Sequence, residues 1–566
     1  MRTKEALYFL ESDTLKTLYK KNGMDYANYE ERLHYLQNLA SQNGYEVHNI
    51  DADALRGIKK NALVIALDMM ALSDHEISDI DTFVKNGGRL LFNFTSGFLD
   101  KNLKYRKNNL VYTITGMELN NKINTIKLNK KAVPFLTVRL SSPLAIYLPD
   151  GWGMDMSLYD PLPVFKTNKD LVADAYLTNW SQTNYISLSK EKTLNAQESA
   201  LIWHGSKGRG KWVYFSFPSY IFMNGEQKLY TKLFKGMLAY LHNMTTVVPY
   251  PYIDAKNVVF VEEDTEYRYE NLLHFTNVSK KHKFPVTAFC VARLAKKHTA
   301  LMKEVGKSPY LEIGSHSYSH DKIVGQSDAV YEKETQGSKE LLEALTSKPV
   351  IGFRPPREEI DKKLFAYLSQ AGYKYVLNEG ENRLTAYFKD SMLIIPRHAT
   401  DDYSYLINLD WSSKQILTNM IKELHTVVNL DGMYTLSVHT HLMSFGSNIV
   451  ILDKFFAYVK KHKEFHPMNG EMIYKRAVEK RDLHIEQELT QKKIILTITN
   501  ENKHVIRNLK YEISVDPTVT LHGVESEIIG FKATLKKEKP FRYLLDIREL
   551  KPKSKIRIFI NYDKTL

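Results

Sequence analysis

Three widely separated segments in the middle of the chain carry side chains that are able to take part in hydrolysis. Each segment places acids or imidazoles directly after a short apolar stretch of strand character. The candidates are Glu262, Glu263 and Asp264 after Val258–Val261, His316 and His320 within Gly314–His320, and His439 and His441 at the end of Leu436–His441. Taken singly, each has a commoner structural explanation: an acidic turn, a surface histidine or a buried histidine with satisfied hydrogen bonds. Their combination is what favours a function.

These residue types suit a metal-assisted hydrolase. Two imidazoles and one carboxylate make a three-ligand site that leaves open positions for water, and zinc and similar metals prefer such donors. A histidine that titrates near neutral pH can serve as a general acid, and a further carboxylate can take a proton from water. The acidic group at 262–264 follows a strand, which is where barrel enzymes place catalytic residues.

The elements around these candidates alternate between strand and helix patterns from about residue 252 to 480. One strand-like run, Val286–Val291, contains the only cysteine, Cys290, which we interpret as a buried strand residue. This alternation predicts a mainly parallel sheet with helices packed on it.

The order of the motifs resembles the polysaccharide deacetylase family (NodB homology, carbohydrate esterase family 4). The acidic strand end is followed by the His-x-x-x-His loop, by Phe353-Arg-Pro-Pro-Arg357 and by the late strand histidine. Phe284–Phe289 and Ala371–Tyr375 also match segments of that fold. The resemblance covers residues 252–467 and implies a distorted (β/α) barrel of the NodB type.

Carried over position by position, the resemblance implies that Asp264, His316 and His320 bind the metal. Family members whose two acidic residues are separated by one position place the general base two residues before the metal ligand. That spacing gives Glu262 the role of base, with Glu263 as the adjacent candidate, where the family normally has Asp.

The same resemblance assigns the remaining site residues. Arg354 would hold the base through a charge-assisted hydrogen bond. His439 would be the general acid, and His441 is an additional neighbour without a definite counterpart. Arg397, within Ile395-Pro-Arg-His398, is a candidate for the late part of the site.

The implied reaction is the removal of N-acetyl groups from a bacterial polysaccharide, either an exopolysaccharide or peptidoglycan. One divalent metal ion, with zinc as the expected species, would polarise the carbonyl and activate water, the base would remove a proton, and the acid would protonate the departing amine. Expected partners are the N-acetylated polymer and envelope or polysaccharide-export proteins.

The flanking regions predict two further domains. Residues 1–246 show strands near 7–10, 62–67 and 90–94 alternating with helices over 29–43 and 75–85, which predicts an open, flavodoxin-like α/β domain. This region resembles ThuA-like and class I amidotransferase-like folds, yet it lacks the cysteine nucleophile of those amidotransferases. Residues 483–566 contain short alternating strands at the spacing of a small β-sandwich, after a central domain at 252–480. The three-part order is loosely similar to the Pel exopolysaccharide deacetylase without its hydrolase part.

Composition and charge narrow the classes of protein to which this chain can belong. The net charge of +13 is spread over short basic runs far apart in the sequence, without a nucleic-acid-binding motif, so no nucleic-acid partner is expected. No apolar run reaches about 18 residues, so no transmembrane helix is expected. The first residues lack a signal-peptide core, which leaves a cytoplasmic protein or an envelope protein whose targeting segment was removed.

Two alternatives to a polysaccharide deacetylase remain open from the sequence. The first is a catalytically weak or inactive glycan-binding or assembly protein on a deacetylase scaffold, because a base one methylene longer than Asp alters the catalytic geometry. The second is a small-molecule amide hydrolase on the same fold.

Overall fold

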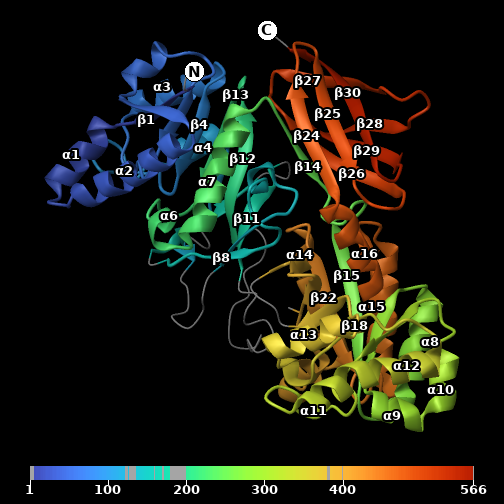
Figure 1. The fold of residues 1–566 in the computed structure, drawn as a ribbon. Coiled ribbons are helices and arrows are strands. Elements are labelled where there is room, and N and C mark those ends of the chain that lie inside the picture. Colours follow the sequence, from blue (N-terminus) through green and yellow to red (C-terminus); the bar gives the residue numbers. More distant parts are fainter. Residues whose placement is uncertain are drawn as a thin grey trace.

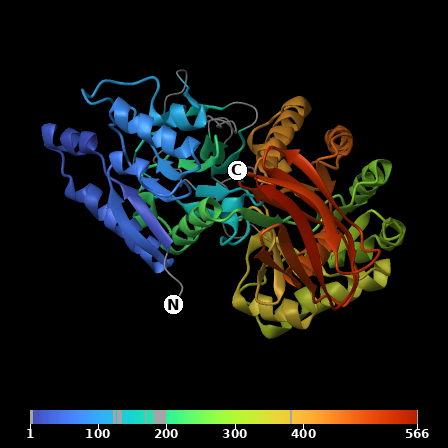
Figure 2. The ribbon, with the colours of Figure 1, turned by 90° about the horizontal axis from the view of Figure 1, so that it is seen from above.

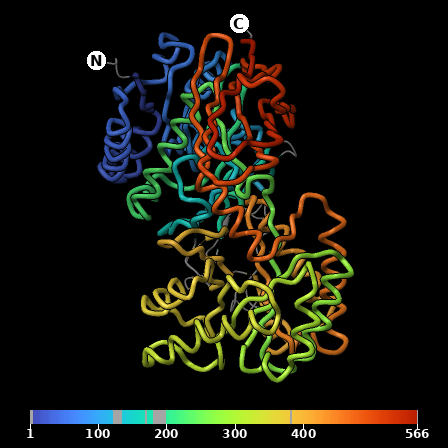
Figure 3. Tube along the Cα trace, turned by 45° about the vertical axis from the view of Figure 1, so that its right-hand side comes forward, coloured from blue at the N-terminus to red at the C-terminus, as the bar shows by residue number. Residues whose placement is uncertain are grey.

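The computed structural model describes residues 5–120, 125–126, 135–158, 160–167, 171–178, 199–378, 383–397 and 399–564. These residues form a mixed α/β protein, which confirms the predicted class. Figures 1 and 3 show the N-terminal part and the C-terminal sheets at one end of the molecule and the central part at the other. No helix in the described ranges has both the length and the apolar character needed to cross a bilayer.

The N-terminal part is built on a sheet with spatial order β2-β1-β3-β4-β13-β12-β11-β7-β8. The first five strands in this order run parallel, and the pairings from β13 to β8 are antiparallel. Every predicted strand and helix of the first hundred residues is present. The strands are β1 (Glu5–Leu10), β2 (Tyr45–Ile50), β3 (Leu63–Ala66), β4 (Arg89–Asn93), β7 (Phe135–Val138), β8 (Gly153–Asp155), β11 (Ala173–Thr178), β12 (Ala200–Lys207) and β13 (Gly210–Phe215), and the main helices are α1 (Asp13–Lys21), α2 (Ala27–Gln42), α3 (Asp74–Lys85), α4 (Leu110–Thr115) and α7 (Gln227–His242).

Local sequence signals explain where these helices begin and end. Helix α3 starts with a capping box, in which the Ser73 hydroxyl and the Glu76 carboxylate each accept from the other's backbone N–H. It ends at Lys85 with Asn86 as the C-cap, and the chain leaves the helix through Gly87, whose φ of 113° suits a residue without a side chain.

The central part is a curved, mainly parallel sheet with order β20-β21-β19-β18-β17-β16-β15-β22, and β23 also pairs with β15. Among the described strands of this sheet, β20 alone runs antiparallel to its neighbour. The strands are β15 (Asn257–Thr265), β16 (Val286–Cys290), β17 (Leu311–Ser315), β18 (Gly352–Phe353), β19 (Tyr375–Asn378), β20 (Tyr387–Lys389), β21 (Met392–Pro396), β22 (Met433–His439) and β23 (Phe465–Pro467). The covering helices include α8 (Leu272–His282), α9 (Ala292–Lys297), α10 (Thr299–Val305), α12 (Ser338–Thr346), α13 (Lys362–Gln370), α14 (Ser413–Val428), α15 (Ile449–Lys461) and α16 (Gly470–Arg481).

Strand β15 is buried on both faces, and its two faces have different surroundings. Val258 and Phe260 belong to an inner cluster with aromatic and aliphatic residues of β16, β19 and β21, whereas Val259 and Val261 belong to the larger core that includes the helices. Because side chains alternate along a strand, Glu262 and Asp264 share the inner face and Glu263 lies on the helix-covered face.

The C-terminal region consists of two four-stranded antiparallel sheets, with orders β14-β26-β29-β28 and β24-β25-β30-β27 among the described residues. Apolar residues of both sheets form one shared core. The strands are β24 (Leu483–Leu489), β25 (Lys493–Asn500), β26 (Ile506–Val515), β27 (Val519–Ser526), β28 (Ala533–Lys539), β29 (Arg542–Leu550) and β30 (Ser554–Lys564). Strand β14 (Thr245–Pro249) comes from the segment that joins the N-terminal and central parts, and it pairs with β26 from Thr245–Val515 to Pro249–Tyr511. The boundary predicted around 246–252 is therefore itself a structural element of the C-terminal region.

A buried charged cluster joins the N-terminal part to the central part. Asp174, which is 0% exposed, accepts from Ser142 Oγ at 2.7 Å and contacts His204 Nδ1 at 2.6 Å and Arg139 Nη2 at 3.5 Å. Arg139 also reaches Asp431 of the central part at 3.4 Å. Figure 2, seen from above, shows the N-terminal part beside the C-terminal sheets, which lie over the central part.

Replacing Asp174 with Ala should destabilise the protein by about 3–5 kcal/mol, because it leaves the buried charge of Arg139 without one of its two carboxylates. Urea unfolding of the whole chain measures this loss. Asp53→Ala is the matched control, since that carboxylate is 73% exposed and its removal should change little. Equal urea concentrations at the unfolding midpoint for both variants would contradict a structural role for the cluster.

Candidate metal centre and catalytic groups

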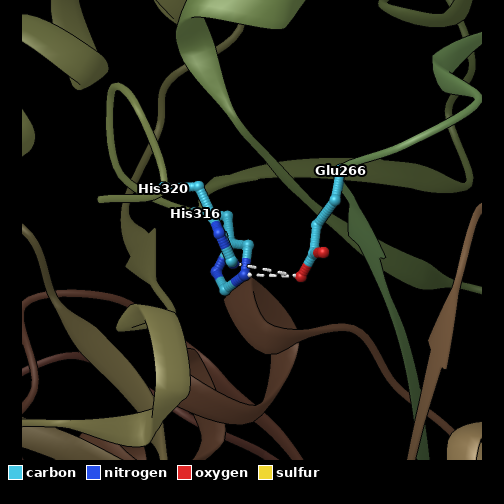
Figure 4. A group of neighbouring side chains, drawn as sticks. All are labelled: Glu266, His316 and His320. Atoms are coloured by element: carbon cyan, nitrogen blue, oxygen red, sulfur yellow. Dashed lines mark hydrogen bonds and ion pairs between the residues drawn. The ribbon is translucent and has the colours of Figure 1, made fainter. Parts of the chain in front are cut away.

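Glu266, His316 and His320 form a compact group of potential metal ligands. Their ligand atoms all lie within 4.8 Å of one another. Glu266 Oε1 lies 3.3 Å from His316 Nε2 and 3.2 Å from His320 Nε2, and both rings face the carboxylate (Figure 4). Burial alone would raise the pKa of Glu266, but its hydrogen bonds to the two histidines hold the pKa below its usual range.

The hydrogen bonding of His316 shows that these residues fit a cation. His316 Nδ1 donates to the Arg354 carbonyl at 2.9 Å, and a carbonyl can only accept, so Nδ1 carries a proton. The hydrogen bond from His316 Nε2 to Glu266 then needs a second proton on the ring, and a ring protonated on Nδ1 alone directs the Nε2 lone pair at the carboxylate. A cation between these two acceptors removes their repulsion, and the carbonyl contact is the kind of second-shell bond that orients metal-binding histidines.

The loop after β17 holds the two histidines at the required spacing. Glu334, which is buried, accepts from the backbone N–H groups of Tyr318 and Ser319, each at 2.9 Å. His320 donates its own N–H to Ser317 Oγ at 2.9 Å and has a left-handed φ of 65°. The irregular loop expected from the glycine and serines is thus fixed by its own hydrogen bond and by those to Glu334.

Asp264 lies beside this group and is held by Arg354. Arg354 Nε donates to Asp264 Oδ2 at 2.6 Å, and the guanidinium also contacts Glu358 at 3.3 Å and Glu262 at 3.6 Å. Burial alone would raise the pKa of Asp264, but Arg354 and then His316 lower it. Asp264 is therefore a carboxylate at neutral pH and can accept a proton.

Glu262 and Glu263 have different environments from Asp264. Glu262 is completely buried two residues below Asp264 on the inner face, and burial raises its pKa to about 8 against the opposing charge of Arg354. It is therefore uncharged at neutral pH. Glu263 points to the opposite face of β15 and accepts from Ser444 Oγ, and burial raises its pKa as well.

His439, the last residue of β22, faces Asp264 from the neighbouring strand. Its Nε2 lies 3.8 Å from Asp264 Oδ2, and its Nδ1 lies 2.6 Å from Asp402 Oδ1. Asp402 Oδ2 also accepts from the N–H groups of His439 at 2.7 Å and Met443 at 3.0 Å. Burial would lower the pKa of His439, but Asp402 and its hydrogen bond, with Asp264, raise it to about 10. His439 is therefore a protonated donor across the neutral range.

His441 and Arg397, the remaining candidates from the sequence, are not among the potential metal ligands. His441 contacts the His439 ring at a centroid distance of 5.4 Å, and burial, followed by the charge of His439, lowers its pKa. Arg397 pairs with Asp401 at 3.0 Å and also with Glu358, which links it to Arg354 through a shared carboxylate. His398 lies outside the described residues.

The structure brings together most of the residues selected from the sequence, and it adds Glu266 to the potential metal ligands. His316, His320, Arg354, Asp264 and His439 surround one site, Glu262 lies beneath it, and Glu263 lies on the other face of the strand. The carboxylate facing both histidines is Glu266, which the sequence analysis did not select. The expected strand ended before 262, whereas β15 continues to Thr265, so that Glu266 is the first residue beyond it.

Asp402 is the second residue that the sequence analysis missed. The available signal was weak: two consecutive aspartates, Asp401 and Asp402, follow the strand-like segment 392–396. The contact between Asp402 and His439 depends on the tertiary fold, in which the segment after β21 lies beside β22 and Ala399 N–H donates to the Thr435 carbonyl at 3.3 Å.

Comparisons with known proteins found one family model and several solved structures that are similar to the central part. The family model for polysaccharide deacetylase matches residues 255–376. No curated protein matched the chain. Solved structures similar to it include a protein from Mycobacterium smegmatis described as a polysaccharide deacetylase, with 17% identity over 43% of this chain and 97% of that one and a TM-score of 0.37.

Two other similar structures come from Bacillus species. One is PdaA, a family 4 carbohydrate esterase of Bacillus subtilis, with 18% identity over 40% of this chain and 86% of that one and a TM-score of 0.30. The other is a family 4 pseudoenzyme of Bacillus anthracis, with 17% identity over 39% of this chain and 66% of that one and a TM-score of 0.30. The chain therefore contains a domain, at residues 255–376, that matches the polysaccharide deacetylase family model.

Proposed function

We propose that the chain is a metal-dependent deacetylase that hydrolyses N-acetyl groups of a bacterial polysaccharide, either an exopolysaccharide or peptidoglycan, and releases acetate. The observation that carries this proposal is the convergence of three potential ligands, an arginine-held carboxylate and an aspartate-held histidine around one point. Envelope or export proteins are the partners that this substrate implies.

We assign the metal to Glu266, His316 and His320 in place of the set containing Asp264. Two imidazoles and a carboxylate with open coordination positions suit zinc best. When bound, the cation would polarise the amide carbonyl and lower the pKa of a water molecule.

The protein groups supply the proton transfers. Asp264, ionised and oriented by Arg354, takes a proton from the attacking water. His439, protonated and oriented by Asp402, delivers a proton to the amide nitrogen as the carbon–nitrogen bond breaks. The water oxygen ends in acetate, and the sugar leaves as its amine. Glu262 and Glu263 are uncharged and buried, so we assign the role of base to Asp264, the residue type that the family normally has.

The test combines metal analysis with acetate release from N-acetylglucosamine oligomers and polymers. We expect about one zinc per chain and acetate release, and we expect His316→Ala to lose both. Release from small amides alone would favour a small-molecule hydrolase. Bound metal with no release from any substrate would favour a glycan-binding protein instead.

A further inference from the structure

An exposed pair of aromatic side chains lies beside the site on two loops that follow β15 and β22. Tyr267, directly after Glu266, is 63% exposed, and Phe445 is 42% exposed. Large aromatic side chains usually bury most of their surface, and those that remain exposed near a site commonly contact a ligand.

The two loops form one fixed surface. Thr440 Oγ1 donates to the Tyr267 carbonyl at 2.6 Å, and Asn271 Nδ2 donates to the Thr440 carbonyl at 2.9 Å. Arg268, with a left-handed φ of 48°, places its guanidinium 4.2 Å from the centre of the Phe445 ring. A ring orientation fixed in advance reduces the entropy lost on binding.

This surface is continuous with the proton donor. The Tyr267 ring contacts the His441 ring edge-to-face at 5.2 Å, and His441 contacts the His439 ring at 5.4 Å. Tyr267 thus adjoins His439 through His441, and Phe445 lies against Arg268, the residue after Tyr267. Pyranose rings carry C–H-rich faces that pack on aromatic rings while their hydroxyl groups remain in water.

We propose that Tyr267 and Phe445 form a platform for a second sugar residue, so that the protein prefers a polymer over a single N-acetylated sugar. This inference rests on the proposed function and specifies its substrate class. The platform residues position the substrate and take no part in the proton transfers.

The test measures binding in the Asp264→Asn background, where turnover does not remove the ligand. The probes are N-acetylglucosamine and its β-1,4-linked pentamer, titrated calorimetrically into the zinc-loaded full chain. We expect tighter binding of the pentamer, and Phe445→Ala and Tyr267→Ala should each weaken pentamer binding roughly five- to tenfold with little effect on the monomer. Metal analysis of each variant checks that zinc is still bound, because Glu266 is the neighbour of Tyr267 in the sequence.

Tyr105→Ala is the matched control, because Tyr105 is 60% exposed in the N-terminal part and should leave both affinities unchanged. Equal affinity for the two probes, or pentamer affinity unaffected by both platform variants with zinc retained, would overturn the platform. Absence of acetate release by the unmodified protein, measured separately, would instead overturn the proposed function.

Discussion

Replacing Glu266 with Gln is expected to empty the metal centre, whereas replacing Asp264 with Asn should leave the metal bound and stop turnover. Glu266 faces both imidazoles, so losing its charge should weaken zinc binding by at least about 100-fold, the upper range seen for indirect metal partners. Asp264 is bonded to Arg354 instead, and losing it as a proton acceptor should lower kcat by about 10²–10⁴-fold.

Zinc content and single-substrate kinetics on the purified variants measure the two effects separately. Glu262→Gln is the control, because that carboxyl is uncharged at neutral pH and its amide has nearly the same shape. Loss of zinc in Asp264→Asn with full retention in Glu266→Gln would restore the ligand set expected from the sequence. Full loss of turnover in Glu262→Gln alone would restore Glu262 as the base.

Replacing Asp402 with Asn should move the alkaline limit of activity to lower pH. The Asp402 carboxylate and its hydrogen bond raise the pKa of His439 to about 10, so the protonated donor persists up to that pH and is lost above it. Without this charge the pKa of His439 falls, and the rate begins to decline at a lower pH. Removing the donor itself, in His439→Gln, should lower kcat by about 10²–10⁴-fold at pH values below about 10, where His439 is protonated in the unmodified protein.

A pH profile of kcat/KM for the unmodified protein and Asp402→Asn checks this expectation. Asp401→Asn is the neighbouring control, since Asp401 pairs with Arg397 and does not contact His439. The role assigned to Asp402 fails if its variant and the Asp401 variant keep the same alkaline limit.

The sequence was sufficient to predict which strands carry the site. His316, His320, Arg354 and His439 were each selected from motif order, and each lies at the carboxyl end of a strand of one parallel sheet or on the loop that follows it. Parallel strands place these ends on the same edge, which is why distant motifs converge.

The assignment of the acidic residues depended on strand length, which sequence patterns determine poorly. Glu262 and Asp264 look like turn residues because carboxylates are rare within buried strands. Strand β15 nevertheless runs to Thr265, because Arg354 compensates the charge of Asp264 and burial keeps Glu262 uncharged. With Glu266 as the ligand, the spacing of one intervening residue still applies and gives an aspartate as the base.

Tertiary contacts supply what the sequence could not show. Asp402 reaches His439 because the segment after β21 lies beside β22, and Glu334 supports the histidine loop from a helical segment further along the chain. Neither carboxylate has a local signal that distinguishes it from the many surface acids.

The short strand β14 has a consequence for how the molecule can be divided and how it assembles. Its partner β26 is made only after the whole central part, so Thr245–Pro249 has no sheet neighbour until nearly all of the chain has been synthesised. Contacts this distant in sequence form slowly, and an unpaired strand invites association with other chains in the meantime. A fragment that begins at the central part lacks β14, so β26 becomes an unpaired edge of its sheet. A fragment that stops after the central part lacks β26, so β14 has no partner strand. The central part is thus enclosed, in sequence, between the first strand of one sheet and the other three strands of that sheet.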